Sequence, residues 1–337
     1  MQPVTDVRLV EPLGDSSGTV GSAIEKGVNV DVIVFGGGGL IGSYAVADLC
    51  ELGMEVAVFS RSAPKGILKS YEDRLHWIYG DVGDAEEVAR AVSDSGAGRI
   101  VHLAAALQFD CDRAPDAAMR INIGGTINVL DAARNHGVER VVFASSGAAF
   151  GVRADRQLED VPVGPEITIY GSSKLLAEHI GIRYAEQHGF DFIALRYNMT
   201  FGPGNVTSPG MAKVIQDVTG AMDGDAVTIS EVGGELQRHL TYVRDSATAT
   251  ALALTHPNPS HHVYNVAGPD ENYVTLREFT EMMKEVEPNC GTVTFTGQGR
   301  EAGAVDTTRI RDDLGYQPQY SIPDGLRAQR EDLKKWW

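Results

Sequence analysis

The sequence predicts an α/β fold, in which a doubly wound parallel sheet carries helices on both faces and a smaller lobe follows at the C-terminal end. The first observation is an apolar, β-branched run at residues 30–35 that stops at four glycines and leads into a helical pattern. The second is that further apolar runs follow along the chain, at residues 55–60, 76–79, 99–103 and 140–144. With 337 residues and 43% hydrophobic content, the chain can bury a large core.

The chain divides into three expected parts. Residues 1–28 mix glycine, serine and short apolar patches, and we expect an N-terminal extension that is either partly ordered against the body or disordered. Residues 29–198 would form the sheet domain, and residues 199–337 mainly the smaller lobe. Strands near 190–198 and 262–267 would return to the sheet.

Composition excludes several classes of function. The chain has 29 basic and 46 acidic residues, a net charge of −17, which argues against binding to nucleic acid or to an anionic membrane. The cysteines Cys50, Cys111 and Cys290 lack the spacing of a disulfide framework or a zinc site, so a cytoplasmic location is expected. Since no apolar run is long enough to span a bilayer, we expect no membrane association. The spacing of the cysteines and histidines resembles no set of metal ligands, so we also expect no metal centre.

The first strand, turn and helix carry the clearest motif. The turn contains Gly36, Gly39 and Gly42, each three residues apart. Gly36 would allow a tight turn, Gly39 would let the backbone approach a pyrophosphate, and Gly42 would let the helix pack closely on the strand. Leu40 and Ile41 begin the helix, whose positive end would face the phosphates. The pattern predicts a Rossmann-type dinucleotide-binding domain.

The second strand bears on the choice between NAD and NADP. In the NAD pattern an acidic residue at this strand's end binds the ribose 2′-hydroxyl, whereas here the strand ends in Ser60 and Arg61. A guanidinium can bind the additional phosphate of NADP through paired, charge-assisted hydrogen bonds. We therefore expect NADP, and NAD stays possible.

The next strands end in residues that suit a ligand at the sheet's edge. The third strand ends at Asp81 and Val82, and the fourth ends in the small residues Ala104, Ala105 and Ala106. An amphipathic helix is expected over 115–136, and the fifth strand ends in Ser145 and Ser146. Each of these features also occurs as ordinary packing or as an ordinary strand end.

Tyr170 and Lys174 begin the next helical stretch. Positions four apart share one helix face, so the phenol and the ammonium would point the same way. A nearby ammonium favours the phenolate and would lower the pKa of Tyr170. The pair could then donate or accept a proton near neutral pH.

These features occur in the order seen in the short-chain dehydrogenase/reductase superfamily. The chain resembles the extended branch of that superfamily, which includes sugar-nucleotide epimerases, dehydratases and reductases. The similarity covers nearly the whole chain after residue 29, and its segments are 104–106, 122–130, 195–204, 241–245, 263–268 and 314–318.

The resemblance implies roles for individual residues. Tyr170 would be the general acid/base, Lys174 would bind the nicotinamide ribose, and Ser146 would hydrogen-bond the reacting oxygen. The cofactor would contact Gly36, Gly39, Leu40, Ile41, Gly42, Ser60, Arg61, Asp81, Val82, Ala104, Ala105, Ala106, Asn122, Ser145, Tyr170 and Lys174. A homodimer is also implied, since family members pair through the helices that hold Asn122 and Tyr170.

Departures from the family pattern narrow the reaction and the substrate. The dehydratases carry an Asp-Glu pair after the fifth strand, and here residues 147–150 are Gly-Ala-Ala-Phe, so water elimination is not expected. In the lobe, Met199 replaces the asparagine that contacts a sugar nucleotide's diphosphate, and Asn198 lies one place early. Arg238 and Arg300 match positions of diphosphate-binding arginines.

The leading hypothesis is an NADP(H)-dependent oxidoreductase that reduces a carbonyl or oxidises an alcohol, with nucleotide-activated sugars as the favoured substrates. One alternative is a sugar-nucleotide epimerase that keeps its cofactor bound. From another class, a non-catalytic protein that senses NAD(P) would retain the fold without needing the Ser/Tyr/Lys set.

Overall fold

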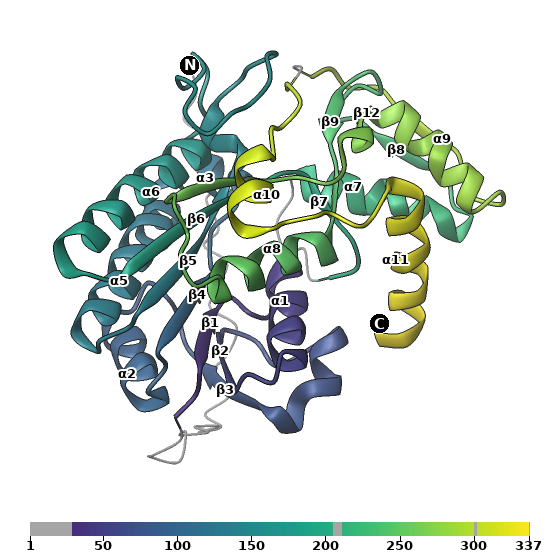
Figure 1. Cartoon of the computed structure of the whole chain (residues 1–337). Coiled ribbons are helices and arrows are strands. Elements are labelled where there is room, and N and C mark those ends of the chain that lie inside the picture. Colours follow the sequence, from purple (N-terminus) through teal and green to yellow (C-terminus); the bar gives the residue numbers. More distant parts are fainter. Residues whose placement is uncertain (1–28, 205–210, 300–301, 337) are drawn as a thin grey trace, which may run out of the picture.

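The computed structural model describes residues 29–204, 211–299 and 302–336. The expected extension at 1–28 and the candidate Arg300 therefore lie outside the described residues. Figure 1 shows a central sheet with helices packed on both faces and a smaller lobe beyond its carboxyl edge. The doubly wound parallel sheet expected from the sequence is present.

Seven parallel strands form the main sheet. Their spatial order is β3 (Leu75–Tyr79), β2 (Val56–Ser60), β1 (Val32–Phe35), β4 (Arg99–His102), β5 (Arg140–Ser146), β6 (Asp191–Tyr197) and β11 (Val263–Val266). The order reverses between β1 and β4, and open α/β sheets bind their ligands at this switch point.

Helices cover the two faces of the sheet because its strands are apolar on both sides. On one face lie α1 (Leu40–Glu51) and α8 (Val243–Thr255), which pack against each other. On the other face lie α2 (Ala85–Ser95), α5 (Gly125–Asn135) and α6 (Ile169–His188). Along β1 the side chains of Val32 and Val34 join the first core, and those of Ile33 and Phe35 join the second.

The helix expected over 115–136 is interrupted. It consists of α4 (Pro115–Met119), a π-helical turn (Arg120–Gly124) and α5, and a short helix α3 (Gln108–Arg113) precedes it. Single π-turns inside helices often mark functional positions. Here the turn contains Asn122.

The lobe is built from short strand pairs and helices. Its strands pair as β7 (Thr200–Phe201) with β10 (Thr241–Tyr242), β9 (Gln237–His239) with β12 (Tyr273–Thr275), and β8 (Val227–Ile229) with β13 (Val293–Phe295). Its helices are α7 (Met211–Gly220), α9 (Leu276–Val286), α10 (Thr308–Leu314) and α11 (Ile322–Trp336). Among the described residues, no helix has the length and apolar content needed to cross a bilayer.

Candidate active site

The turn between β1 and α1 has space only for glycine at two positions. Gly36 has φ +81°, and a Cβ there would lie 2.6 Å from the backbone nitrogen of Ala104. A Cβ at Gly42 would lie 2.4 Å from the carbonyl oxygen of Gly36. The turn therefore brings α1 against β1 and β1 against the end of β4.

The N-terminus of α1 is open to an anion. Gly39 is the N-cap residue and supplies no capping side chain, and the first turn contains no acidic residue. No side chain of α1 therefore neutralises the partial positive charge at its N-terminus. That charge suits the negatively charged pyrophosphate of a dinucleotide. Leu40 lies against the chain after β7, since a Cβ at Gly204 would be 2.5 Å from its Cδ1, and Ile41 packs against the core.

The end of β2 presents a hydroxyl and a cation. The hydroxyl of Ser60 lies 3.0 Å from the position that a Gly38 Cβ would take, so it faces the glycine turn. Arg61 is exposed, and no ion pair involves it within the described ranges. The indole of Trp77 donates to the carbonyl oxygen of Ser62 at 3.2 Å, which fixes the chain beyond the strand.

Asp81 and Val82 shape the loop after β3. The Asp81 carboxylate accepts the Gly83 amide at 2.8 Å and lies 3.8 Å from the guanidinium of Arg120. Val82 is buried, and its carbonyl oxygen accepts the Asn128 amide at 3.0 Å. Both residues thus lie where the chain after β3 meets the π-turn and α5.

Asn122 links the loop after β4 to α6. Its Oδ1 accepts the Ala106 amide at 2.8 Å, and its Nδ2 donates to the Ala106 carbonyl and to the Ser173 hydroxyl, both at 3.0 Å. The side chain is 3% exposed. The π-turn therefore fixes the position of the alanines at 104–106 relative to the helix that carries Lys174.

Tyr170 and Ser146 meet in the structure. Thr168 caps α6 by accepting the Gly171 amide at 3.0 Å, which places Tyr170 in the helix's first turn. Its phenol lies close enough to the Ser146 hydroxyl for that group to lower the phenol's pKa, and the Ser146 hydroxyl accepts the Ala148 amide at 3.1 Å. Burial raises the pKa of Tyr170 to about 12, although the Ser146 hydroxyl acts to lower it.

Lys174 lies one turn further along α6 and is 3% exposed. Its ammonium donates to the Ala144 carbonyl at 2.7 Å and lies 5.7 Å from the centre of the Tyr170 ring. Burial lowers the pKa of Lys174 to about 8, against the charges of Cys111 and Glu178, which raise it. The expected lowering of the Tyr170 pKa is therefore not present in the protein alone, because desolvation outweighs the lowering effect of the Ser146 hydroxyl.

The two hydroxyls at the end of β5 lie beside different residues of α6. Ser146 faces Tyr170, whereas Ser145 is buried and donates to the carboxylate of Glu178. A contact between Ser145 and the cofactor stays a prediction, and its hydroxyl is engaged with the protein.

Of the candidate substrate residues in the lobe, Asn198 lies beside the chain that follows Ser146. Its amide nitrogen is 2.3 Å from the position of a Gly147 Cβ, which places it beside Ser146. Met199 has φ +25°, a left-handed conformation that is uncommon for a residue with a side chain. Arg238 lies on β9, its Nη1 donates to the Gln237 carbonyl at 2.7 Å, and burial lowers its pKa to about 10.

Two residues at this site did not emerge from the sequence. Glu178 lies four positions after Lys174, and helical spacing could have indicated it. Cys111 lies within electrostatic reach of both Tyr170 and Lys174, and no local pattern marks it. In the part of the chain that the structure describes, no cluster of three or more His, Cys, Asp or Glu side chains could hold a metal ion.

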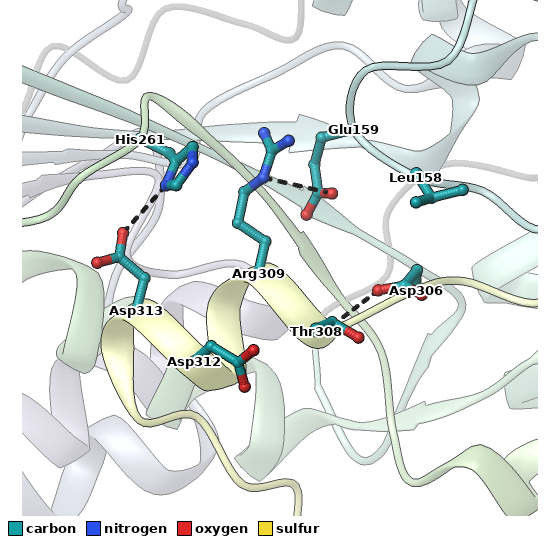
Figure 2. A pocket seen from close by; sticks show the side chains of 8 residues that line it. All are labelled: Leu158, Glu159, His261, Asp306, Thr308, Arg309, Asp312 and Asp313. Atoms are coloured by element: carbon teal, nitrogen blue, oxygen red, sulfur yellow. Dashed lines mark hydrogen bonds and ion pairs between the residues drawn. The ribbon is translucent and has the colours of Figure 1, made fainter.

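A hollow of about 430 Å³ lies elsewhere, between the chain at 158–159 and α10. Figure 2 shows that His261 faces Asp313 and that Arg309 faces Glu159. His261 lies 3.4 Å from Asp313, and Arg309 lies 3.6 Å from Glu159. Because these charges are paired within the protein, the hollow has no constellation comparable to that of Tyr170, Ser146 and Lys174.

Comparisons with known proteins agree with this geometry. A model described as the NAD dependent epimerase/dehydratase family matches residues 32–267. A UDP-glucose 4-epimerase of Lactobacillus helveticus is 28% identical over 318 residues, covering 88% of this chain and 94% of that protein. A dTDP-glucose 4,6-dehydratase of Streptomyces antibioticus is 27% identical over 331 residues, covering 91% and 94%.

Solved structures of UDP-glucose 4-epimerases are also similar to this chain. The crystal structure of a Thermus thermophilus UDP-glucose 4-epimerase in complex with NAD has a TM-score of 0.79 and 28% identity, and covers 90% of this chain and 98% of that one. The UDP-glucose 4-epimerase of Thermotoga maritima with UDP-glucose has a TM-score of 0.78 and 25% identity, with coverage of 90% and 98%.

Proposed function

Because the chain belongs to the NAD dependent epimerase/dehydratase family, we propose that it is an NAD(P)-dependent epimerase acting on a hydroxyl-bearing carbon of a nucleotide-activated sugar. The observation that carries this proposal is the contact between Tyr170 and Ser146 beside the ammonium of Lys174. Two relatives described as UDP-glucose 4-epimerases, one of them solved with NAD, support the choice of reaction and of sugar nucleotide.

The residues after β5 favour epimerisation over dehydration. The short 3₁₀ helix at Gly147–Phe150 contains only glycine, alanine and phenylalanine. Eliminating water from a sugar needs an acid and a base in addition to the tyrosine, and this segment supplies no carboxylate. The similarity to a dehydratase therefore supports the shared oxidation step and not the elimination.

The cofactor would be held by the glycine turn and by Lys174. The turn fits a dinucleotide, because the close approach at Gly36 and the uncapped start of α1 leave backbone amides for the pyrophosphate. Once bound, a nicotinamide supplies reversible hydride acceptance from the sugar carbon.

The protein's own part in the reaction is proton transfer and orientation. The Tyr170 oxygen takes the proton of the sugar hydroxyl as that carbon is oxidised, and returns it when the hydroxyl forms again. The Ser146 hydroxyl holds the same sugar oxygen. The Lys174 ammonium would favour the phenolate by its charge, and an oxidised nicotinamide bound nearby would favour it further, which would offset the effect of burial on the phenol.

A net reductase that uses NADPH is the second candidate. Its support is the end of β2, where the Ser60 hydroxyl faces the glycine turn and Arg61 is exposed, in place of the carboxylate typical of NAD sites. A released and exchanging NADPH suits net reduction. A non-catalytic NAD(P) sensor is the third candidate, and the buried Lys174 argues against it because burying an ammonium is costly without a chemical use.

Substrate binding would involve the start of the lobe. Asn198 lies beside Ser146, Met199 follows it in a strained conformation, and Arg238 offers a partly buried cation for a diphosphate. Arg300, expected to provide a second cation, lies outside the described residues. A cytoplasmic homodimer that pairs through α5 and α6 stays part of the proposal.

The deciding experiment measures cofactor and product together. The purified protein is analysed for bound NAD or NADP, and is then incubated with UDP-glucose and with dTDP-glucose. An epimerase is expected to release a sugar epimer without net consumption of cofactor. Stoichiometric oxidation of added NADPH would support the reductase instead.

Tyr170→Phe provides the matched control, since it removes only the phenolic oxygen. We expect turnover to fall by about 10²- to 10⁴-fold while cofactor binding is retained. Full turnover in this variant would remove the basis of the proposal.

A further inference from the structure

The end of β5 divides its side chains between two faces. Val141 and Phe143 belong to the core on the α6 side, and Ser145 continues that row. Val142 and Ala144 belong to the opposite core, and Ser146 follows them. The two adjacent serines therefore serve two different environments, and only Ser146 reaches the phenol of Tyr170.

Ser145 is part of a buried polar cluster. Its hydroxyl donates to Glu178 Oε1, and the same carboxylate accepts Arg196 Nε at 2.8 Å and Nη2 at 2.7 Å. Arg196 is the register partner of Ser145 on the neighbouring strand β6. Its Nη1 donates to the Glu159 carbonyl at 3.1 Å, in the chain that leads to Tyr170. We refer to Ser145, Glu178 and Arg196 as the β5–α6 clamp.

Stability alone does not account for the clamp. The side chains of Arg196 and Glu178 are 8% and 2% exposed, so both charges are desolvated. A buried ion pair of this kind often contributes no more to the free energy of unfolding than apolar residues of the same volume would. The cluster is therefore better explained by the geometry that it imposes.

That geometry ties three consecutive residues of β5 to three successive turns of α6. The Ala144 carbonyl accepts from Lys174, the Ser145 hydroxyl donates to Glu178, and the Ser146 hydroxyl lies beside the phenol of Tyr170. The three helix positions are four apart and lie on one face. The clamp involves the middle residue of the three on β5 and the last of the three positions on α6. Its carboxylate, that of Glu178, also binds Arg196 on the neighbouring strand β6.

We propose that Glu178 is a positioning residue, which holds Ser146 in register with Tyr170 and Lys174 through its bonds to Ser145 and Arg196. The proposal rests on the proposed function for its kinetic consequence. Its physical basis is that displacing a reacting group by about 1 Å can cost about a hundredfold in rate.

Ser145→Ala is the sharpest test, because it removes the link to β5 and leaves the ion pair of Glu178 and Arg196 intact. We expect kcat to fall by about tenfold to a hundredfold, with KM for the sugar nucleotide nearly unchanged. Glu178→Gln retains an acceptor for Ser145 and should keep more activity than Glu178→Ala.

Asp191→Asn is the matched control. Asp191 pairs with Arg140 at 2.7 Å and links the same two strands at their amino ends, away from the reacting groups. This variant should lower the midpoint of thermal unfolding and leave kcat unchanged. An unchanged kcat in Ser145→Ala, or an equal loss in Asp191→Asn, would overturn the proposal.

Hydrogen exchange separates this proposal from the proposed function, because it requires no substrate. In Ser145→Ala, the backbone amides at 144–147 should exchange faster than in the wild type, and in Asp191→Asn they should not. If the wild type acts on neither UDP-glucose nor dTDP-glucose, the proposed function fails, and hydrogen exchange still tests whether Glu178 positions the end of β5. Unchanged exchange at 144–147 in Ser145→Ala would contradict that positioning role.

Discussion

Burial moves the pKa values of Tyr170 and Lys174 in opposite directions, and both shifts favour the uncharged form. The pKa of Tyr170 is raised to about 12, and that of Lys174 is lowered to about 8. At neutral pH the phenol keeps its proton and the ammonium keeps its charge. A positive charge added near the phenol, such as an oxidised nicotinamide, would then be needed to bring Tyr170 into a useful range.

The pKa of Lys174 gives a prediction for stability. Its folded-state value of about 8 lies below the ordinary 10.5, so between these pH values the unfolded chain binds more protons than the folded one. The free energy of unfolding of the wild type should therefore rise with pH relative to that of Lys174→Met. The gain is at most about 3 kcal/mol, since one pKa unit corresponds to about 1.4 kcal/mol. Urea unfolding of both proteins from neutral pH upwards measures this gain. If the free energy of unfolding changed with pH in the same way in both, the lowered pKa of Lys174 would be contradicted.

The glycine turn gives a second prediction at this scale. Gly36 and Gly53 have nearly the same backbone angle, φ +81° and +80°, but only Gly36 has atoms within 4 Å of an added Cβ. Gly53→Ala should cost about 1 kcal/mol, from conformation alone. Gly36→Ala should cost more and should also abolish NAD binding, because the turn must shift away from Ala104. Calorimetric titration with NAD compares the two, and equal affinities would refute the role of Gly36.

At the scale of elements, α11 is fixed to the sheet domain by one carboxylate. Asp332 is 3% exposed and accepts the hydroxyls of Tyr44 on α1 and Tyr242 on β10, at 3.0 and 2.9 Å. It also accepts Arg244 Nη2 of α8 at 2.6 Å. Three elements thus meet at one side chain of the C-terminal helix.

Asp332→Asn tests the contribution of this contact. The amide keeps the shape but removes the charge that Arg244 and the two phenols bind, so we expect a loss of about 3 kcal/mol in the free energy of unfolding. Asp324→Asn is the control, because its ion pair with Arg327 is on the surface of the same helix, with 57% and 60% of the side chains exposed. That change should cost less than about 1 kcal/mol. Similar losses in both variants would count against the contact.

For the whole molecule, the parallel direction of the strands places the candidate residues that follow them at one edge, where the carboxyl ends of the strands lie. The glycine turn follows β1, Ser60 ends β2, and Ser146 ends β5. A dinucleotide bound across that edge would contact both halves of the sheet. Binding would then increase the free energy of unfolding of the whole sheet domain.

Ligand-dependent stability also tests the choice of cofactor. At a hundred times its dissociation constant, a dinucleotide adds about 2.7 kcal/mol to the free energy of unfolding. If Arg61 binds a 2′-phosphate, Arg61→Ala should weaken the stabilisation by NADP and leave that by NAD unchanged. Thermal unfolding with each cofactor measures both. Equal effects on NAD and NADP would remove the argument for NADP.

Features that depend on short-range periodicity could be predicted from the order of the amino acids. The run of apolar residues before Gly36 specified a buried strand, and the spacing of Tyr170 and Lys174 placed both on one helix face. Such patterns repeat every two residues in a strand and every 3.6 in a helix, so a few neighbours suffice to define them. The order of these motifs was enough to indicate the family.

Contacts and pKa shifts that depend on distant parts of the chain could be found only in the folded protein. Ser145 was expected to contact the cofactor, and only the folded protein shows that its hydroxyl donates to Glu178 while Ser146 lies beside Tyr170. Asp332 bonds Tyr44 across 288 residues, which no local pattern encodes. The direction of the Tyr170 pKa shift likewise follows from desolvation, and desolvation is set by whichever segments pack around a group after folding.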